Sequence, residues 1–184
     1  SGWRGTWKLD GGGALMNQSI HMVDLLLYLA GEPAEVSAFA GTLTHPGLEV
    51  EDTVVANIRF ADGGFGVIEA STSCAPGFPR KIELSGEHGT VVLEDDRIAR
   101  WQFDEEWPED AEIRAAGSKG EGLAGAAGDP RAAGSEGHRR QFQDVIDALK
   151  DRRAPRIPGS EGLRALRLIE AIYESARTGK VQAL

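Results

Sequence analysis

The chain has 184 residues, 41% of them hydrophobic and 27% charged, with a formal net charge of -9. The acidic balance argues against a nucleic-acid or anionic-membrane partner, because both bind through clusters of Lys and Arg. The single cysteine, Cys74, excludes an intrachain disulfide and a thiolate metal cluster, and it favours a reducing, cytoplasmic location. No apolar run approaches the roughly 20 residues that span a bilayer. We therefore expect a globular protein with one sizeable core or two small ones.

The first predicted element is a helix over residues 13–30, "GALMNQSIHMVDLLLYLA". Asp10 is placed to cap its start. Gly31 followed by Pro33 is a typical helix end. The helix is apolar almost all the way round, which is the pattern of a buried helix.

Three polar residues interrupt that apolar helix: Asn17, His21 and Asp24. At 3.6 residues per turn they lie within about 60° of one another, with Tyr28 on the same side. An unpaired amide or carboxylate is costly to bury, so these groups must face a partner or a cavity. One interpretation is a proton-transferring His21 oriented by Asp24, with Asn17 holding a hydroxyl. The alternative is a core histidine paired with Asp24 or a carbonyl. A metal site is not expected, since Asn is a poor ligand and His45, His88 and His138 have no helical relation to His21.

Strand patterns follow, with short turns between them. We predict strands over residues 35–44, 52–60, 65–73, 80–86, 90–95 and 97–103. Short turns between neighbours predict an antiparallel meander. Within 52–73, apolar residues occupy both faces: Val54, Ala56 and Ile58 alternate with Val55 and Phe60, and Val67 lies beside Ile68. Large apolar sheet faces seldom stay wet, so we expect the second face to pair with another subunit, in a homodimer or a dimer of dimers.

Residues 114–137 are rich in Gly and Ala, and we predict a long, mobile loop there. Two amphipathic helices come next. In the helix over 136–153 the predicted apolar stripe is Phe142, Val145, Ile146 and Leu149. In the helix over 159–179, capped by Ser160 and closed by Gly179, the predicted core residues are Leu163, Leu166, Ile169, Ala171 and Ile172. Helix, strands, loop and helices in this order predict a single α+β domain, 1–184, with one open, mainly antiparallel sheet and helices on one face.

Taken together, these stretches resemble the C-terminal domain of the Gfo/Idh/MocA (glucose–fructose oxidoreductase / inositol dehydrogenase) family. The resemblance is carried by the Gly11–Gly13 tract with Asn17, His21 and Asp24, and by residues 50–73, 82–95 and 137–181. It implies a substrate-binding and oligomerisation half. The family's N-terminal half is a Rossmann domain that binds NAD or NADP and supplies a lysine in a Glu-Lys-Pro motif. This sequence has neither Glu-Lys-Pro nor Gly-x-Gly-x-x-Gly after a strand.

The resemblance implies roles for individual residues. His21 would be the acid/base on a hydroxyl that becomes a carbonyl. Asn17 stands where many members have Asp, and it would orient substrate or nicotinamide by hydrogen bonds. The Asn form looks most like members that oxidise sugar nucleotides such as UDP-N-acetyl sugar acids. Further substrate-binding candidates are Arg4, Trp7, Lys8, Gly12, Gly13 and His138. The plain alternatives are solvated cations, a packed tryptophan, an ordinary glycine loop and a surface histidine.

The function expected from all of this belongs to a larger enzyme. The chain would be one half of an NAD(P)-dependent oxidoreductase acting on a hydroxyl of a sugar, sugar nucleotide or cyclitol. Alone, it should bind no dinucleotide tightly and turn over nothing. Two other readings stay open: a non-catalytic binding or dimerisation module, and an NAD-dependent glycosidase of the same family.

Overall fold

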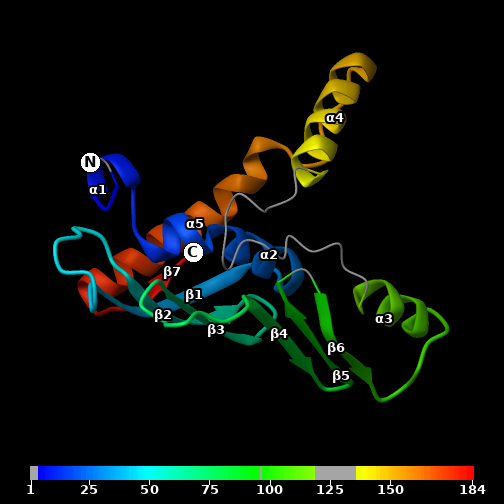
Figure 1. Cartoon of the computed structure of the whole chain (residues 1–184), viewed down its shortest axis with the longest axis horizontal. Coiled ribbons are helices and arrows are strands. Elements are labelled where there is room, and N and C mark those ends of the chain that lie inside the picture. Colours follow the sequence, from blue (N-terminus) through cyan, green and yellow to red (C-terminus); the bar gives the residue numbers. More distant parts are fainter. Residues whose placement is uncertain (1–3, 96, 119–135) are drawn as a thin grey trace. The chain divides into compact units, whose positions relative to one another are not determined.

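A computed structural model describes residues 4–95, 97–118 and 136–184. Contacts within the described chain define two compact units (Figure 1). The first runs to Ala75 and also contains Pro158–Leu184, whereas the second lies within Pro76–Ile157.

The first unit opens with three consecutive helical segments. They are α1 (Trp7–Asp10), a π-helical turn η1 (Ala14–Ser19) and α2 (Ile20–Ala30). The helix predicted over 13–30 is thus present, but residues 14–19 have π rather than α geometry. Gly31 ends α2 as predicted, with its N–H donating to the carbonyl of Leu27 at 3.1 Å. The predicted cap at Asp10 is wrong, because Asp10 closes α1 and Gly13 is the residue before η1.

Four antiparallel strands form the sheet of this unit, in the order β3-β2-β1-β7. They are β1 (Pro33–Gly41), β2 (Thr53–Phe60), β3 (Phe65–Ser71) and the short β7 (Gln182–Ala183). The predicted hairpin is present as β2 and β3, with Val54 opposite Ala70 and Ala56 opposite Ile68. The sequence pattern did not predict β7, since a two-residue strand is too short to show an alternation.

One face of this sheet carries the core; α5 (Gly159–Thr178) and η1 pack on it, and α2 packs against α5 and η1. The buried stripe of α5 is Ala165, Leu168, Ile169, Ile172 and Ser175. Two predictions of facing are therefore wrong. Leu163 is 49% exposed, because it lies outside the stripe that meets the sheet. Phe60 is buried on the same face as Val54, as the two-residue period of a strand requires.

The α5 helix also supplies a hydrogen-bond acceptor to a main-chain N–H on the open edge of β1. Strand β7 pairs with β1 at Glu35 and Val36, so it does not reach Ala38. The N–H of Ala38 instead donates to Oγ of Ser175 at 3.0 Å. Both residues are buried, and this hydrogen bond ties the last turn of α5 to the middle of β1. Gly179 ends α5 in a left-handed conformation, as predicted. Ser160 makes no capping hydrogen bond, because Pro158 occupies the N-cap position.

The second unit has a three-stranded antiparallel sheet with the order β4-β5-β6. Its strands are β4 (Lys81–Gly86), β5 (Gly89–Glu94) and β6 (Arg97–Phe103). Helix α3 (Asp110–Ser118) packs on β6. Asp110 begins that helix and is buried, and it accepts hydrogen bonds from the indole N–H of Trp101 at 2.8 Å and the N–H of Trp107 at 2.9 Å.

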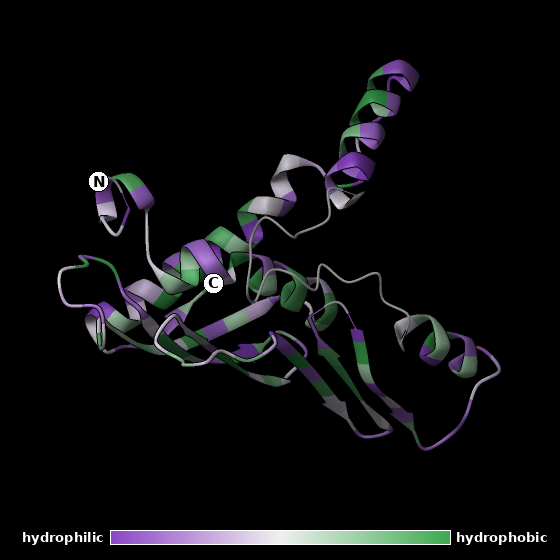
Figure 2. Cartoon of the chain, viewed as in Figure 1, coloured by the Kyte–Doolittle hydropathy of each residue, from purple (hydrophilic) through white to green (hydrophobic). Residues whose placement is uncertain are grey.

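Helix α3 corrects the predicted loop over 114–137, because its last five residues, 114–118, are helical. Asp110 and the packing on β6 stabilise a segment whose composition is poor in large apolar residues. Residues 119–135 of that predicted loop lie outside the described residues. Helix α4 (Glu136–Asp151) follows and is amphipathic (Figure 2). Its predicted stripe is exposed: Phe142, Val145, Ile146 and Leu149.

The predicted class is confirmed: the protein is α+β, with mainly antiparallel sheets and helices packed on them. The strands differ from a single meander in forming two sheets, of four and three strands. Among the helices of the described ranges, none is both long enough and apolar enough to cross a membrane.

Candidate active site

The π-helical turn η1 starts on a buried carboxylate. Glu51, at the entrance to β2, is 4% exposed. Its side chain accepts the N–H of Gly13 at 2.8 Å and the N–H of Leu15 at 2.9 Å. Its main-chain carbonyl accepts the N–H of Ala14 at 3.0 Å. Three consecutive N–H groups, which have no intrahelical acceptor at a helix start, are therefore satisfied by a single residue whose negative charge suits that end of the helix.

The glycines before η1 allow this close approach. A Cβ on Gly13 would overlap the carbonyl oxygen of Glu51, and a Cβ on Gly12 would overlap the hydroxyl of Tyr173. That hydroxyl donates to Oε1 of Glu51 at 3.0 Å. Burial and the neighbouring Glu51 carboxylate raise the pKa of Tyr173, so it stays a neutral donor. Gly12 and Gly13 thus have a packing role in this chain. Their predicted contact with substrate stays a prediction.

Asn17 lies in η1 and its side chain is held from α1. Its Nδ2 donates to Oδ1 of Asp10 at 2.7 Å, and Oδ2 of Asp10 accepts the N–H of Gly5 at 2.7 Å. Since one N–H of the amide is directed to Asp10, the orientation of the Asn17 side chain is fixed, and its carbonyl oxygen can act as an acceptor. Asn17 itself is exposed. Its free acceptor can therefore receive a hydrogen bond from a ligand hydroxyl.

His21 and Asp24 follow on α2, and both side chains are exposed. Tyr28, one turn further on, is 78% exposed. The polar face of the helix is therefore open, while Val23 and Leu27 on the opposite side enter the core. Within the described ranges no hydrogen bond joins His21 to Asp24. The predicted orientation of the imidazole by Asp24 is therefore not seen, but the two groups do share an accessible face.

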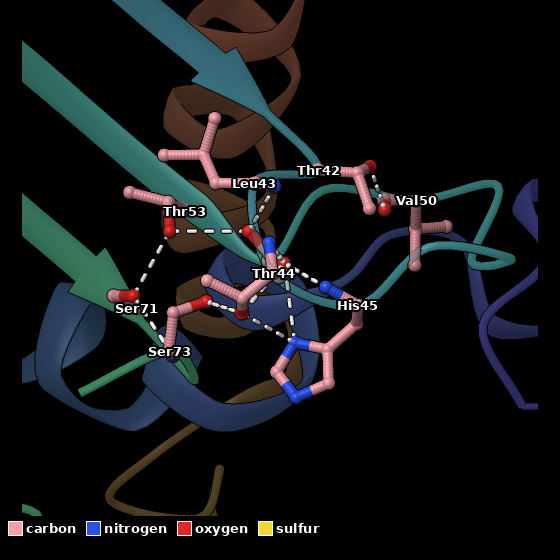
Figure 3. Close-up of polar contacts among 9 residues, drawn as sticks. Thr42, Leu43, Thr44, His45, Val50, Thr53, Ser71 and Ser73 are labelled. Atoms are coloured by element: carbon pink, nitrogen blue, oxygen red, sulfur yellow. Dashed lines mark hydrogen bonds and ion pairs between the residues drawn. The ribbon is translucent and has the colours of Figure 1, made fainter. Parts of the chain in front are cut away.

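The next residue after Glu51, Asp52, organises the preceding loop, whose residues Leu43, Thr44 and His45 are labelled in Figure 3. Its fully buried carboxylate accepts the N–H groups of Leu43 at 2.8 Å, Thr44 at 2.8 Å and His45 at 3.0 Å. Nδ1 of His45 lies 3.1 Å from Oδ2, and Thr53 donates at 3.1 Å. The main-chain donors of Leu43 and Thr44, together with His45, hold the pKa of Asp52 well below its usual value. Asp52 is therefore an anion that fixes the loop between β1 and β2.

The remaining predicted residues divide between the units. Trp7 packs edge-on against Tyr173, with ring centroids 5.2 Å apart, and it lines an open pocket of about 500 Å³ with Glu49, Glu51 and Arg177. Lys8 and Arg4 are exposed beside it in the chain. His138 is exposed in the first turn of α4, in the second unit. Roles for these four residues in substrate binding remain predictions.

Sequence reasoning missed the two residues that shape this site from outside the helix. The signal for Glu51 and Asp52 was an acidic pair directly before the apolar alternation of β2. Such a pair is ordinary at a strand end, and nothing local shows that both carboxylates are buried. Tyr173 was missed for the same reason, because its partner lies 122 positions away.

Proteins that are similar to this chain include several oxidoreductases. The family model described as "Oxidoreductase family, C-terminal alpha/beta domain" matches residues 1–184. The WlbA dehydrogenase of Bordetella pertussis, in complex with NADH and UDP-GlcNAcA, superposes with a TM-score of 0.86 at 37% identity, over 100% of this chain and 51% of that one. The WlbA dehydrogenase of Chromobacterium violaceum, with the same two ligands, gives 0.83 at 34% identity, over 100% and 49%. An inositol 2-dehydrogenase of Paenarthrobacter aurescens is 29% identical over 88% of this chain and 45% of its own length.

The full-length match of the family model defines the class. The chain belongs to the Gfo/Idh/MocA oxidoreductase family, as its C-terminal alpha/beta domain. It spans about half the length of these relatives. The predicted resemblance is thereby confirmed.

Proposed function

We propose that this chain is the substrate-binding and oligomerisation half of an NAD(P)-dependent oxidoreductase that oxidises a hydroxyl of a sugar, sugar nucleotide or cyclitol. The observation that carries the proposal is the open polar face of η1 and α2, where Asn17 and His21 are exposed while the opposite side of the helix enters the core through Leu15, Val23 and Leu27. The dinucleotide would be held by an N-terminal half beyond this sequence, which fits relatives twice as long.

The chemical step that we assign to this chain is the transfer of one proton from the substrate. His21 accepts the hydroxyl proton of the substrate as general base, and an exposed imidazole exchanges it with solvent. Asn17 accepts a hydrogen bond from a hydroxyl through its carbonyl oxygen, and the bond from its amide nitrogen to Asp10 fixes the orientation of that amide. Asp24 supplies a negative charge on the same face. When bound, NAD or NADP supplies the hydride acceptor.

A nucleotide sugar acid is the substrate class that we infer within this range. The solved relatives at 37% and 34% identity are both described with UDP-GlcNAcA. This chain has cationic side chains, Arg4 and Lys8, directly before the glycine tract, where they suit an anionic ligand. Binding of UDP-GlcNAcA to the full-length protein, measured by calorimetry against myo-inositol, tests this choice. Tighter binding of myo-inositol would contradict it.

The experiment that tests the catalytic role is substitution of His21 in the protein expressed from its full reading frame. We expect His21→Asn to lower kcat by roughly 10²–10⁴-fold, the usual contribution of a general acid/base group. His88→Asn is the matched control, because His88 is exposed on the β4–β5 turn of the other unit. Unchanged turnover in His21→Asn would remove His21 from the mechanism. A reading frame without an upstream dinucleotide-binding sequence would instead favour a non-catalytic module.

The open face of the four-stranded sheet supports the proposed homo-oligomer. Phe39 is 83% exposed and lies opposite Val55 on β2, and Val67 and Phe65 are exposed on the same face, further along the hairpin on β3. Apolar groups gathered on one sheet face are typical of an interface between copies. Sedimentation should therefore show a dimer or tetramer. The double substitution Phe39→Ser with Phe65→Ser should dissociate it, whereas Phe78→Ser, an equally exposed change in the second unit, should not. A monomeric unsubstituted protein at micromolar concentration would refute the interface.

A further inference from the structure

We propose that Glu51 is the positioning residue of the Asn17–His21 pair. This inference rests on the proposed function, since it assigns a role in placing the same acid/base group. Glu51 does not reach the substrate face, because its carboxylate is buried beneath the glycine tract. It acts through the main chain of η1, to which it supplies acceptors for Gly13, Ala14 and Leu15.

The segment that carries Asn17 and leads to His21, η1, is π-helical. A π-helix bonds i to i+5 and has more residues per turn than an α-helix, and such turns gather at functional sites. Asn17 lies inside η1 and His21 lies one residue past the start of α2. Their mutual angle therefore depends on the π geometry being kept. Reversion of this turn to α-helix would change the direction of Asn17 relative to His21, although both residues would stay on one face of the helix.

The second step is that the π geometry depends on what anchors its start. The N–H groups of Gly13, Ala14 and Leu15 all point to Glu51. The carbonyl of Gly13 accepts the N–H of Asn17 at 2.9 Å. The main chain is therefore hydrogen-bonded continuously from Glu51 through Gly13 to Asn17, and a shift of Glu51 displaces the whole turn.

The third step is that Glu51 is itself immobilised. The hydroxyl of Tyr173, from α5, donates to Oε1 of Glu51. Gly12 and Gly13 pack so closely that a Cβ on Gly12 would overlap Tyr173 and a Cβ on Gly13 would overlap Glu51. The glutamate is thus held between a core helix and the start of η1. A glutamine at position 51 has the same shape but presents an N–H₂ to one of these N–H groups, which then has no acceptor.

The test uses the full-length protein and two neighbouring carboxylates. Glu51→Gln should lower the single-turnover rate constant for substrate oxidation, by roughly 10²-fold for a displacement of about 1 Å. Asp52→Asn is the matched control, because Asp52 is equally buried but its hydrogen bonds go to residues 43–45 and Thr53. A merely structural role would reduce the amplitude of the single turnover, through loss of folded protein, but not its rate constant.

Amide exchange measured by mass spectrometry supplies a readout independent of turnover. In Glu51→Gln, exchange should rise in peptides covering 13–21, and in Asp52→Asn it should rise over 42–46. A normal rate constant in Glu51→Gln, or an equal loss in both variants, would overturn the proposal. If Glu51→Gln does not fold, exchange is measured on the unsubstituted protein instead. Fast exchange of the main-chain N–H groups of residues 13–15 would then overturn the proposal. Failure of the catalytic proposal is distinguishable, because His21→Asn would then be active whatever the exchange shows.

Discussion

The hydrogen bond between Ser175 and Ala38 gives a stability prediction whose size follows from the structure. Ser175→Ala removes the acceptor for a buried main-chain N–H in β1, and β7 does not extend far enough to replace it. An unsatisfied buried donor costs about 1–3 kcal/mol. Alanine is the better helix former, by about 0.5 kcal/mol. The net loss in the free energy of unfolding should therefore be about 0.5–2.5 kcal/mol.

The matched control is Ser160→Ala, at the other end of the same helix. Ser160 has the sequence position of a helix cap, and loss of a capping serine costs about 1 kcal/mol. In the structure it is exposed and makes no capping bond, so its replacement should be neutral or slightly stabilising. Urea unfolding followed by circular dichroism measures both variants. A loss in Ser160→Ala with no change in Ser175→Ala would refute the reasoning.

Two further predictions concern the acidic pair and the glycine tract. Because its folded-state pKa lies below the ordinary value of 3.8, Asp52 stabilises the fold at neutral pH, and that contribution is lost as pH falls below about 4. Asp52→Asn should therefore flatten the loss of stability between about pH 7 and pH 3 in urea unfolding, and an unaltered pH dependence would argue against an ionised Asp52. Gly11→Ala should cost about 1–2 kcal/mol, since Gly11 has a φ of 75° in open space. Gly13→Ala should cost more in thermal unfolding, because its Cβ overlaps Glu51; equal costs would contradict the close packing.

Local patterns predicted the elements well where burial follows a simple period. The hairpin of β2 and β3, the second hairpin of β4 and β5, and the α5 helix all lie within a few residues of the predicted ranges. Predictions fail where contacts with another part of the chain decide which side of a helix is buried or which residue caps it. Leu163 fits a helical stripe by spacing, but the sheet meets the side of α5 that carries Leu168. Ser160 fits a cap by type, but Pro158 precedes the first turn.

The sequence predicted the polar residues of the candidate site, but not the contacts that hold those residues in place. Asn17, His21 and Asp24 stand out because polar side chains interrupt an apolar helix, and their exposure in the structure agrees with an open face. The π geometry of η1 left no sign in the sequence, because it depends on acceptors from residue 51. An α-helical period places the three residues on one face as well, so the pattern alone does not distinguish the two helices.

Glu51 and Asp52 are adjacent directly before β2, and their side chains hold two different segments of the chain. Successive residues of an extended chain face opposite ways, so Glu51 turns to η1 while Asp52 turns to the loop before β2. That loop reaches α1, since the N–H of Glu49 donates to the carbonyl of Gly5 at 2.9 Å. The N–H of Gly5 donates in turn to Asp10, which holds the amide of Asn17. Glu51 therefore supports the main chain of η1 directly, whereas Asp52 holds residues 43–45 and the contact of this loop with α1 is made by Glu49. A substitution of Glu51 acts on the site without touching a ligand.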